Sequence, residues 1–272
     1  MNTPPQLTDR NALLKHRARA ARALETFLFD QIADEMHERL QEVNRPFTQV
    51  AVVSGFPDYW RTHFPEADHI LDEDVIAIDS GKYDLVVHAM AMHWANDPVG
   101  QLVQSRRALK PDGLLLAVLF GGETLNELRS ALAEAEIAVL GGLSPRIAPM
   151  AEIRDLGGLL QRAGFALPVA DSLPLKVSYG DVFSLFRDLR NMGETNALLQ
   201  RHKGTMPRTL FAKAGDLYAR AFQGKDGRLE ATFEIIFLTG WAPDDSQQKP
   251  LRPGSAQARL ADALGAVEKK LD

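Results

Sequence analysis

The sequence of 272 residues contains no cysteine, which excludes several kinds of chemistry at once. Disulfide bonds, iron–sulfur ligation, thiolate zinc sites and a cysteine nucleophile all require cysteine side chains. The sequence also lacks any run of the roughly 18 to 20 apolar residues that cross a bilayer. Its N-terminus, MNTPPQLTDRNALL, has no apolar segment of the kind found in a secretory signal. We therefore expect a cytoplasmic protein without a transmembrane segment.

The sequence also has no excess of positive charge. The 31 basic and 36 acidic residues give a net charge of −5, so nucleic acid is not expected as the main partner. The seven histidines never recur at the H-x-x-x-H spacing of a helical zinc site. The sequence therefore predicts neither a metal site nor a nucleic-acid interface.

The patterns along the chain divide it into three parts. Residues 1–46 are predicted to be a helical extension, with a charged helical stretch at 8–43. Residues 47–243 are predicted to form an α/β domain with helical insertions, and residues 244–272 a tail that ends in a short charged helix. From residue 10 to residue 22 the extension has five lysines or arginines and no acid. This basic stretch is either a solvated helix face or a surface for an acidic partner or a membrane.

Apolar runs and their boundaries predict a mostly parallel sheet. Residues 83–92, YDLVVHAMAM, are an almost continuous apolar run, typical of a strand covered on both faces. Asp97 is placed to cap a helix that begins at Pro98, and PDG at 111–113 leads into another buried strand. Strand, helix and strand in this order form a parallel crossover. Further strands are predicted at 48–53, 166–179 and 229–243, and further helices at 124–140, 152–165, 181–191 and 206–222.

The stretch VAVVSGFP, residues 50–57, looks like the first strand and turn of a nucleotide-binding α/β domain, but it has a single glycine. Such a turn normally uses several glycines, which let backbone N–H groups approach the cofactor. Phe56 adds bulk here, and Pro57 has no N–H. Only 28 residues, 55–82, precede the next apolar run, whereas two strand–helix units would need about 50. One such unit is therefore predicted to be missing, which leaves a narrower sheet on that side.

Three segments resemble the class I S-adenosylmethionine-dependent methyltransferases: HWANDP, ALKPDGLLLA and FGGETLNELR. More narrowly, the chain is identified as a member of the methyltransferase-like complex I assembly factor family of mitochondria and alphaproteobacteria. That family is related to the biotin-pathway malonyl carrier methyltransferase. Its specific segments here are DRNALLKHRARAA, LSPRIAPMAEIRDLGGLLQRAGF, RDLRNMGETNAL, FEIIFLTGWAP and KPLRPGSA. The resemblance implies a three-layer Rossmann-like fold with a seven-stranded sheet and an antiparallel last strand.

The resemblance also implies S-adenosylmethionine as a cofactor and a respiratory complex I subunit as a partner, and the mitochondrial relative is linked to arginine hydroxylation. Compared position by position, this chain has only one of the glycines in the family's glycine loop. It also has no counterpart of the family's ribose-binding acid. The family's acidic stretch near the adenine matches LDEDVIAI. The candidate cofactor-binding residues are Ser54, Gly55, Asp72, Glu73, Ala89, Met92 and His93. The candidate substrate cleft consists of Trp94, Gly121, Gly122, Glu123 and Arg146.

Each candidate also has a purely structural interpretation. His93 and Trp94 either form a pocket wall or pack against the next helix. Asp72 and its two acidic neighbours are either an adenine contact or a solvated turn. Arg146 and Arg252 either hold an anionic group or form surface ion pairs.

Two classes of function follow from this sequence. In the first, an enzyme binds S-adenosylmethionine and modifies a protein side chain, because methyl transfer depends mainly on positioning. In the second, the fold is retained as a scaffold for respiratory complex assembly, peripheral to the inner membrane, after cofactor binding is lost. The turn after the first strand has lost most of the family's glycines, whereas the C-terminal segments still match the family. This contrast favours the scaffold. A smaller ligand in the remaining cleft is a third hypothesis.

Overall fold

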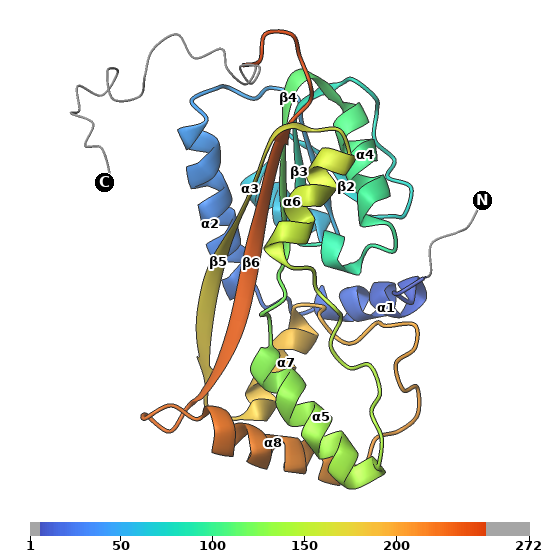
Figure 1. Ribbon diagram of the computed structural model, residues 1–272, viewed down its shortest axis with the longest axis vertical. Coiled ribbons are helices and arrows are strands. Elements are labelled where there is room, and N and C mark those ends of the chain that lie inside the picture. Colours follow the sequence, from blue (N-terminus) through green and yellow to red (C-terminus); the bar gives the residue numbers. More distant parts are fainter. Residues whose placement is uncertain (1–5, 249–272) are drawn as a thin grey trace, which may run out of the picture.

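A computed structural model describes residues 6–248, in which six strands form one sheet in the order β2-β1-β3-β4-β6-β5 (Figure 1). The strands are β1 (Val50–Ser54), β2 (Asp68–Leu71), β3 (Tyr83–Ala89), β4 (Leu109–Phe120), β5 (Ala166–Tyr179) and β6 (Leu229–Trp241). The helices are α1 (Arg10–Ala20), α2 (Phe27–Glu42), α3 (Pro57–His63), α4 (Pro98–Ala108), α5 (Asn126–Leu140), α6 (Ile153–Arg162), α7 (Val182–Asn191) and α8 (Arg208–Phe222), with a short 3-10 helix η1 (Met92–Trp94).

The strand directions follow the sequence prediction. β2, β1, β3 and β4 are parallel neighbours, whereas β6 is antiparallel to both β4 and β5. β3 and the second half of β4 consist almost entirely of buried residues, as expected of central strands covered on both faces. The predicted Rossmann-like architecture with an antiparallel last strand is therefore confirmed.

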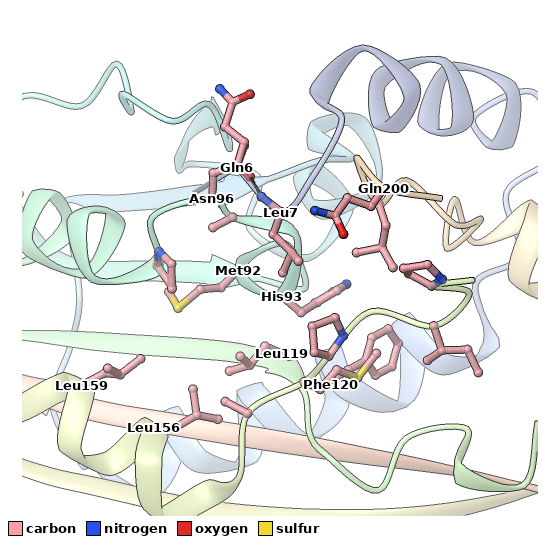
Figure 2. Close-up of a pocket in the computed structure, with 18 residues that line it drawn as sticks. Gln6, Leu7, Met92, His93, Asn96, Leu119, Phe120, Leu156, Leu159 and Gln200 are labelled. Atoms are coloured by element: carbon pink, nitrogen blue, oxygen red, sulfur yellow. Dashed lines mark hydrogen bonds between the residues drawn. The ribbon is translucent and has the colours of Figure 1, made fainter. Parts of the chain in front are cut away.

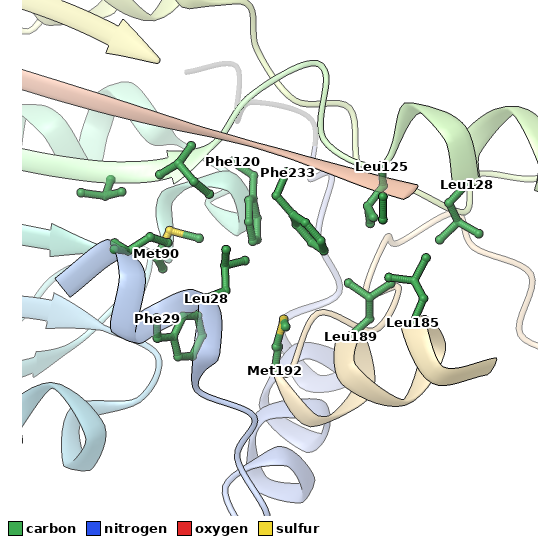
Figure 3. Packing of buried hydrophobic residues seen from close by; sticks show 14 of the residues in the cluster. Leu28, Phe29, Met90, Phe120, Leu125, Leu128, Leu185, Leu189, Met192 and Phe233 are labelled. Atoms are coloured by element: carbon green, nitrogen blue, oxygen red, sulfur yellow. The ribbon is translucent and has the colours of Figure 1, made fainter. Parts of the chain in front are cut away.

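Helices cover both faces of the sheet. One hydrophobic cluster joins the sheet to α2, α5, α7 and α8, and Figure 3 shows its side chains converging on Phe120 and Phe233. A second cluster joins the other face to α4 and α6 through Leu102 and Leu160. The antiparallel pair of β5 and β6, which α7 and α8 connect, extends beyond β4, and α5, α7 and α8 gather around this extension (Figure 1). The carboxyl ends of the parallel strands therefore point toward α1 and the inserted helices (Figure 1).

The sheet is narrow on the β2 side, as the short spacing after β1 predicts. In the described part of the chain, α3 and β2 are the only elements between β1 and β3, and β2 forms the edge of the sheet. All four residues of β2 are at least partly exposed. The segment matched to the family's adenine side begins at Leu71, the last residue of β2, which pairs with Ser54 of β1. Residues 6–248 contain six strands, whereas the resemblance implies seven.

Three local predictions differ from the structure. The helical stretch 8–43 consists of two helices separated by residues 21–26, because α2 packs on the sheet face while α1 crosses its carboxyl edge. The strand predicted at 83–92 ends at Ala89, because Met90 has a positive φ of 48° and turns the chain into η1. β4 already begins before the PDG sequence, and Asp112, with φ 59°, lies where its pairing with β3 shifts in register.

The helix boundaries of the central crossover agree with the sequence prediction. Asp97 caps α4, because its Oδ1 accepts a hydrogen bond of 2.8 Å from the Gly100 N–H, and Pro98 is the first helical residue. α2 packs into the main cluster through Leu28 and Phe29, so this part of the N-terminal segment belongs to the domain core. The charged tail helix and Arg252 lie outside the described residues.

Candidate functional site

The candidate residues gather at the carboxyl edge of the parallel strands, where open α/β sheets bind ligands. β1 ends at Ser54, β3 at Ala89 and β4 at Phe120, and the segments that follow these strands carry most of the other candidates. Asp72 and Glu73 instead follow β2, and Arg146 lies between α5 and α6. Ser54 and Ala89 are neighbours in the sheet register, and both are buried. These two residues are therefore the buried ends of the strands beneath the candidate site.

Three cavities lie along this edge. The edge cavity, about 600 Å³, has largely apolar walls that include Leu7, Met92, His93, Leu119, Ile147 and Leu156 (Figure 2). The aromatic cavity, about 510 Å³, is lined by Trp94, Phe120, Phe186, Phe211, Phe233 and Glu194 among others. The Gly55 cavity, about 310 Å³, is lined by residues that include Arg17, Gly55, Phe56 and Asp72.

Arg17 of α1 fills the space directly above Gly55. A Cβ atom built on Gly55 would overlap the Arg17 guanidinium, so this cation lies against the backbone of the turn. The Arg17 side chain is only 6% exposed, and the interpretation of the basic stretch as a solvated helix face is therefore wrong for this residue. α1 places a positive charge where a nucleotide fold presents its glycine loop to a ligand.

Asp72 follows β2, and two arginines of α1 pair with its carboxylate. Arg17 Nη1 donates to Oδ1 at 2.6 Å, and Arg10 donates to both oxygens at 3.1 and 3.2 Å. Burial raises the pKa of Asp72, but Arg17 and Arg10 together lower it more, so the net pKa lies below 3.8. Because Asp72 is 2% exposed, the solvated-turn interpretation is wrong for it, whereas Glu73 and Asp74 are exposed.

This arrangement decides how well the turn suits a nucleotide cofactor. Such a cofactor needs backbone N–H groups from the turn and an acidic side chain that is free to accept hydrogen bonds from it. Pro57 has no N–H, Phe56 packs against Phe29 with ring centroids 5.8 Å apart, and the Asp72 carboxylate is already paired. These residues fit S-adenosylmethionine only if Arg17 leaves the turn.

His88 of β3 connects this edge to α4. Its Nε2–H donates to the side-chain oxygen of Gln101 at 2.9 Å, and the Gln101 amide donates to the Glu73 carbonyl at 3.0 Å. Complete burial lowers the pKa of His88 to about 4. The imidazole is therefore neutral near pH 7 and acts as a hydrogen-bond donor.

We expect His88 to make the protein less stable in mild acid. The pKa of His88 is about 4 in the folded protein, and we take its ordinary value of 6.5 for the unfolded chain. Burial of the neutral imidazole therefore costs no stability above pH 6.5. Stability is lost as the pH falls from 6.5 towards 4, with a slope of up to about 1.4 kcal/mol per pH unit. Urea unfolding at pH 4.5, 5.5 and 7 would measure it. A His88→Gln variant should lose this part of the slope, and an equal slope in both proteins would contradict the assignment.

His93 and Trp94 share one carboxylate. Trp94 Nε1 donates to Glu194 Oε2 at 2.8 Å, and His93 Nε2 lies 3.2 Å from the same oxygen. The His93 ring also packs on Phe120 with centroids 4.9 Å apart. His93 lines the edge cavity, and Trp94 lines the aromatic cavity. Both residues therefore line cavities and pack on neighbours, which the sequence treated as alternatives.

Gly121, Gly122 and Glu123 build the turn that follows β4. A Cβ atom on Gly121 would overlap the Glu234 side chain, and one on Gly122 would lie 2.6 Å from Glu152 Oε1. The Glu123 N–H donates to Glu234 Oε2 at 2.9 Å, while its own side chain is exposed. The two glycines thus allow carboxylate side chains to approach the backbone. None of the three residues lines the three cavities defined above.

Arg146 forms an ion pair that is buried, not one at the surface. Its Nε and Nη2 donate to the two oxygens of Glu136 at 2.9 and 2.8 Å, and the Ser144 hydroxyl donates to the same carboxylate at 2.6 Å. The side chains of Arg146 and Glu136 are 16% and 3% exposed. The surface-pair interpretation was correct about the pairing and wrong about the burial.

The sequence analysis missed four residues of this edge: Arg10, Arg17, His88 and Glu194. The two arginines lie in a basic stretch that has no local acidic partner, and Asp72 is 55 residues away from Arg17. Glu194 lies 100 residues from Trp94 in the sequence. The only available signal was its place in RDLRNMGETNAL, a segment already quoted for the resemblance. No spacing rule connects partners at such separations.

The strand order and the ligand edge define a class of protein. A family model described as a methyltransferase domain matches residues 33–117, which contain β1 to β3, α4 and most of β4. The chain is thus a Rossmann-like α/β protein of the class I methyltransferase type.

Similarity to known proteins narrows the class to a family. Over 226 residues the chain is 40% identical to "Arginine-hydroxylase NDUFAF5, mitochondrial" of Danio rerio, which covers 83% of this chain and 70% of that protein. The chain belongs to the arginine-hydroxylase NDUFAF5 family. The Dictyostelium discoideum protein of the same name is 40% identical over 72% of this chain and 45% of its own length. The malonyl-[acyl-carrier protein] O-methyltransferase of Laribacter hongkongensis is 34% identical over 67% and 59%.

The chain thus spans between 45% and 70% of the length of these three relatives. Among solved structures, the YcgJ protein of Bacillus subtilis matches with a TM-score of 0.46 and 11% identity, over 72% of this chain and 92% of that one. Within residues 6–248, no three His, Asp or Glu side chains are grouped so as to hold a metal ion. No helix in that range is long and apolar enough to cross a membrane.

Proposed function

We propose that this chain is an assembly factor that binds a protein of respiratory complex I, and that it does so with a methyltransferase fold that no longer binds S-adenosylmethionine. One observation carries the proposal: the Arg17 guanidinium lies on Gly55 and pairs with Asp72 at 2.6 Å. A cofactor that entered this turn would have to break a buried ion pair, which is strongly unfavourable. α1 thus replaces the cofactor as the partner of the turn.

A protein is the proposed partner because of the family and the cavities. Two of the three relatives described above are named arginine-hydroxylases, a name that describes action on an arginine. The edge cavity and the aromatic cavity are lined mainly by apolar side chains, which suits an inserted peptide side chain. The competing function is an arginine-modifying enzyme or a methyltransferase that acts on the same partner. That function requires α1 to withdraw Arg17 from Gly55.

Calorimetric titration with S-adenosylmethionine and S-adenosylhomocysteine separates the two functions. We expect no binding heat and no change in melting temperature, even at millimolar ligand. Micromolar binding, about −8 kcal/mol, would contradict the loss of the cofactor and favour the enzyme. Cooperative thermal unfolding of the wild-type chain in the same buffer is the control, because it shows that the protein tested is folded.

A further inference from the structure

Two basic helix ends meet beside the aromatic cavity. α1 packs beside α7, and each helix carries an arginine in its last turn, Arg19 in α1 and Arg190 in α7 (Figure 1). Arg190 lines the aromatic cavity together with Thr195, whose hydroxyl oxygen accepts a hydrogen bond of 3.0 Å from Arg19 Nη2. The Thr195 carbonyl oxygen lies 3.1 Å from His16 Nδ1. Thr195 is therefore attached to α1 through both its side chain and its backbone.

The guanidinium groups of Arg19 and Arg190 have few partners. Within residues 6–248, neither arginine forms an ion pair, and the Arg190 side chain makes no hydrogen bond. Arg19 donates only to Thr195, and its buried Nε has no acceptor in the described part of the chain. Burial lowers the pKa of Arg19, and the charge of Arg190 lowers it further. Two like charges therefore lie near each other without a counter-ion among the described residues.

The helix ends account for each arginine separately but not for the pair. The C-terminal turn of a helix favours a cation through its dipole, whereas two cations at neighbouring helix ends repel each other. Glu194 precedes Thr195, but its carboxylate does not pair with either arginine. It accepts a hydrogen bond of 2.8 Å from Trp94 Nε1 and lies 3.2 Å from His93 Nε2. An added anion would therefore stabilise this part of the protein.

We propose that Arg19 and Arg190 bind the carboxylate of an acidic side chain that the protein partner places at the rim of the aromatic cavity. A guanidinium presents its N–H donors in a planar fork that matches a carboxylate. The Thr195 hydroxyl accepts from Arg19, so its own O–H can donate to the same carboxylate. Arg190 is exposed, so a ligand reaches it from solvent. This inference rests on the proposed function in one respect, namely that the carboxylate belongs to a protein partner.

The side-chain N–H group of Arg19 provides a local measurement of binding. Its Nε is buried, which slows proton exchange with water, and an Arg19→Gln variant identifies its ¹H–¹⁵N signal. The probes are two acetylated tripeptide amides, one with glutamate between two leucines and one with glutamine, which is neutral and nearly isosteric. At constant ionic strength, we expect the glutamate peptide to shift the Arg19 signal with an affinity at least about tenfold higher than that of the glutamine peptide. Sodium acetate should bind more weakly than the glutamate peptide, and equal affinity would overturn the assignment to a partner's side chain.

Two arginine variants of α7 complete the experiment. Arg190→Gln removes a cation of the proposed site, whereas Arg187→Gln removes an exposed cation of the same helix that does not line the aromatic cavity. Arg190→Gln should weaken the glutamate peptide about tenfold, and Arg187→Gln less than about twofold. Equal binding of the glutamate and glutamine peptides to the wild-type chain would overturn the inference, whatever the folding of the variants. Equal effects of the two substitutions would also overturn it. No arm contains S-adenosylmethionine, so the cofactor titration can fail or succeed independently.

Discussion

Arg17→Met is expected to lower the free energy of unfolding at pH 7 by about 3 kcal/mol, which is a large effect for a single side chain. The substitution removes the closest cation from Asp72 and leaves a 2% exposed carboxylate with only Arg10, whose side chain is 22% exposed. Methionine fills similar space without a charge, so the loss reports on the ion pair and less on packing. Urea unfolding followed by circular dichroism measures it.

The matched control is Arg22→Met, which removes an exposed arginine just beyond the end of α1. It should change the stability by less than about 0.5 kcal/mol. The double variant Arg17→Met with Asp72→Leu should recover much of the lost stability, because no unpaired charge is left buried. If Arg17→Met behaves like Arg22→Met, the ion pair does not stabilise the domain.

The same ion pair has a defined pH dependence. The pKa of Asp72 in the folded state is lowered below 3.8, since the effect of the two arginines exceeds that of burial. The stability that the carboxylate contributes is therefore present above pH 3.8 and is lost as the pH falls through the lower folded pKa. The difference between the wild type and Arg17→Met should shrink at pH 3. A constant difference from pH 7 to pH 3 would indicate that Asp72 is not the group involved.

Arg146→Met is the second substitution with a large expected effect, a loss of about 3 kcal/mol. It leaves the buried Glu136 carboxylate with the Ser144 hydroxyl and N–H as its remaining partners. Burial raises the pKa of Glu136, but Arg146 and Ser144 lower it more, so the carboxylate is charged at neutral pH. The loop that joins α5 to α6 would lose two of the hydrogen bonds that attach it to α5.

Arg129→Met provides the comparison for Arg146, because Arg129 is exposed on the same helix as Glu136. Denaturant unfolding of the two variants should differ by well over 1 kcal/mol, given the ordinary effect of a surface substitution. If Arg146→Met leaves the free energy of unfolding unchanged, the pair with Glu136 contributes little to the fold. That result would favour the alternative in which Arg146 holds an anionic ligand.

The sequence predicted the fold well because the relevant signals are local or periodic. Apolar runs predicted β3 and β4, the Asp97-Pro98 pair predicted the start of α4, and the short spacing of 55–82 predicted the narrow sheet. Each of these depends on a few adjacent residues or on a length of chain. The break between α1 and α2 was missed, because both segments have helical composition and the break follows from where α1 must lie.

The site was harder to predict because its contacts join distant segments. The eroded turn at Gly55 was visible in the sequence, but the group that now lies on it was not, since Arg17 has the same local pattern as the exposed basic residues beside it. Asp72 was placed correctly next to the turn, yet its burial depends on two arginines more than 50 residues away. Glu194 carries no local signature of its role.

The most direct test of the central claim is a crystal structure of the wild-type chain grown with excess S-adenosylhomocysteine. We expect the Arg17 guanidinium on Gly55 and within hydrogen-bond distance of Asp72, with no cofactor density at the carboxyl edge of β1. Cofactor density above Gly55, with Arg17 turned away from Asp72, would contradict the proposal that α1 has replaced the cofactor.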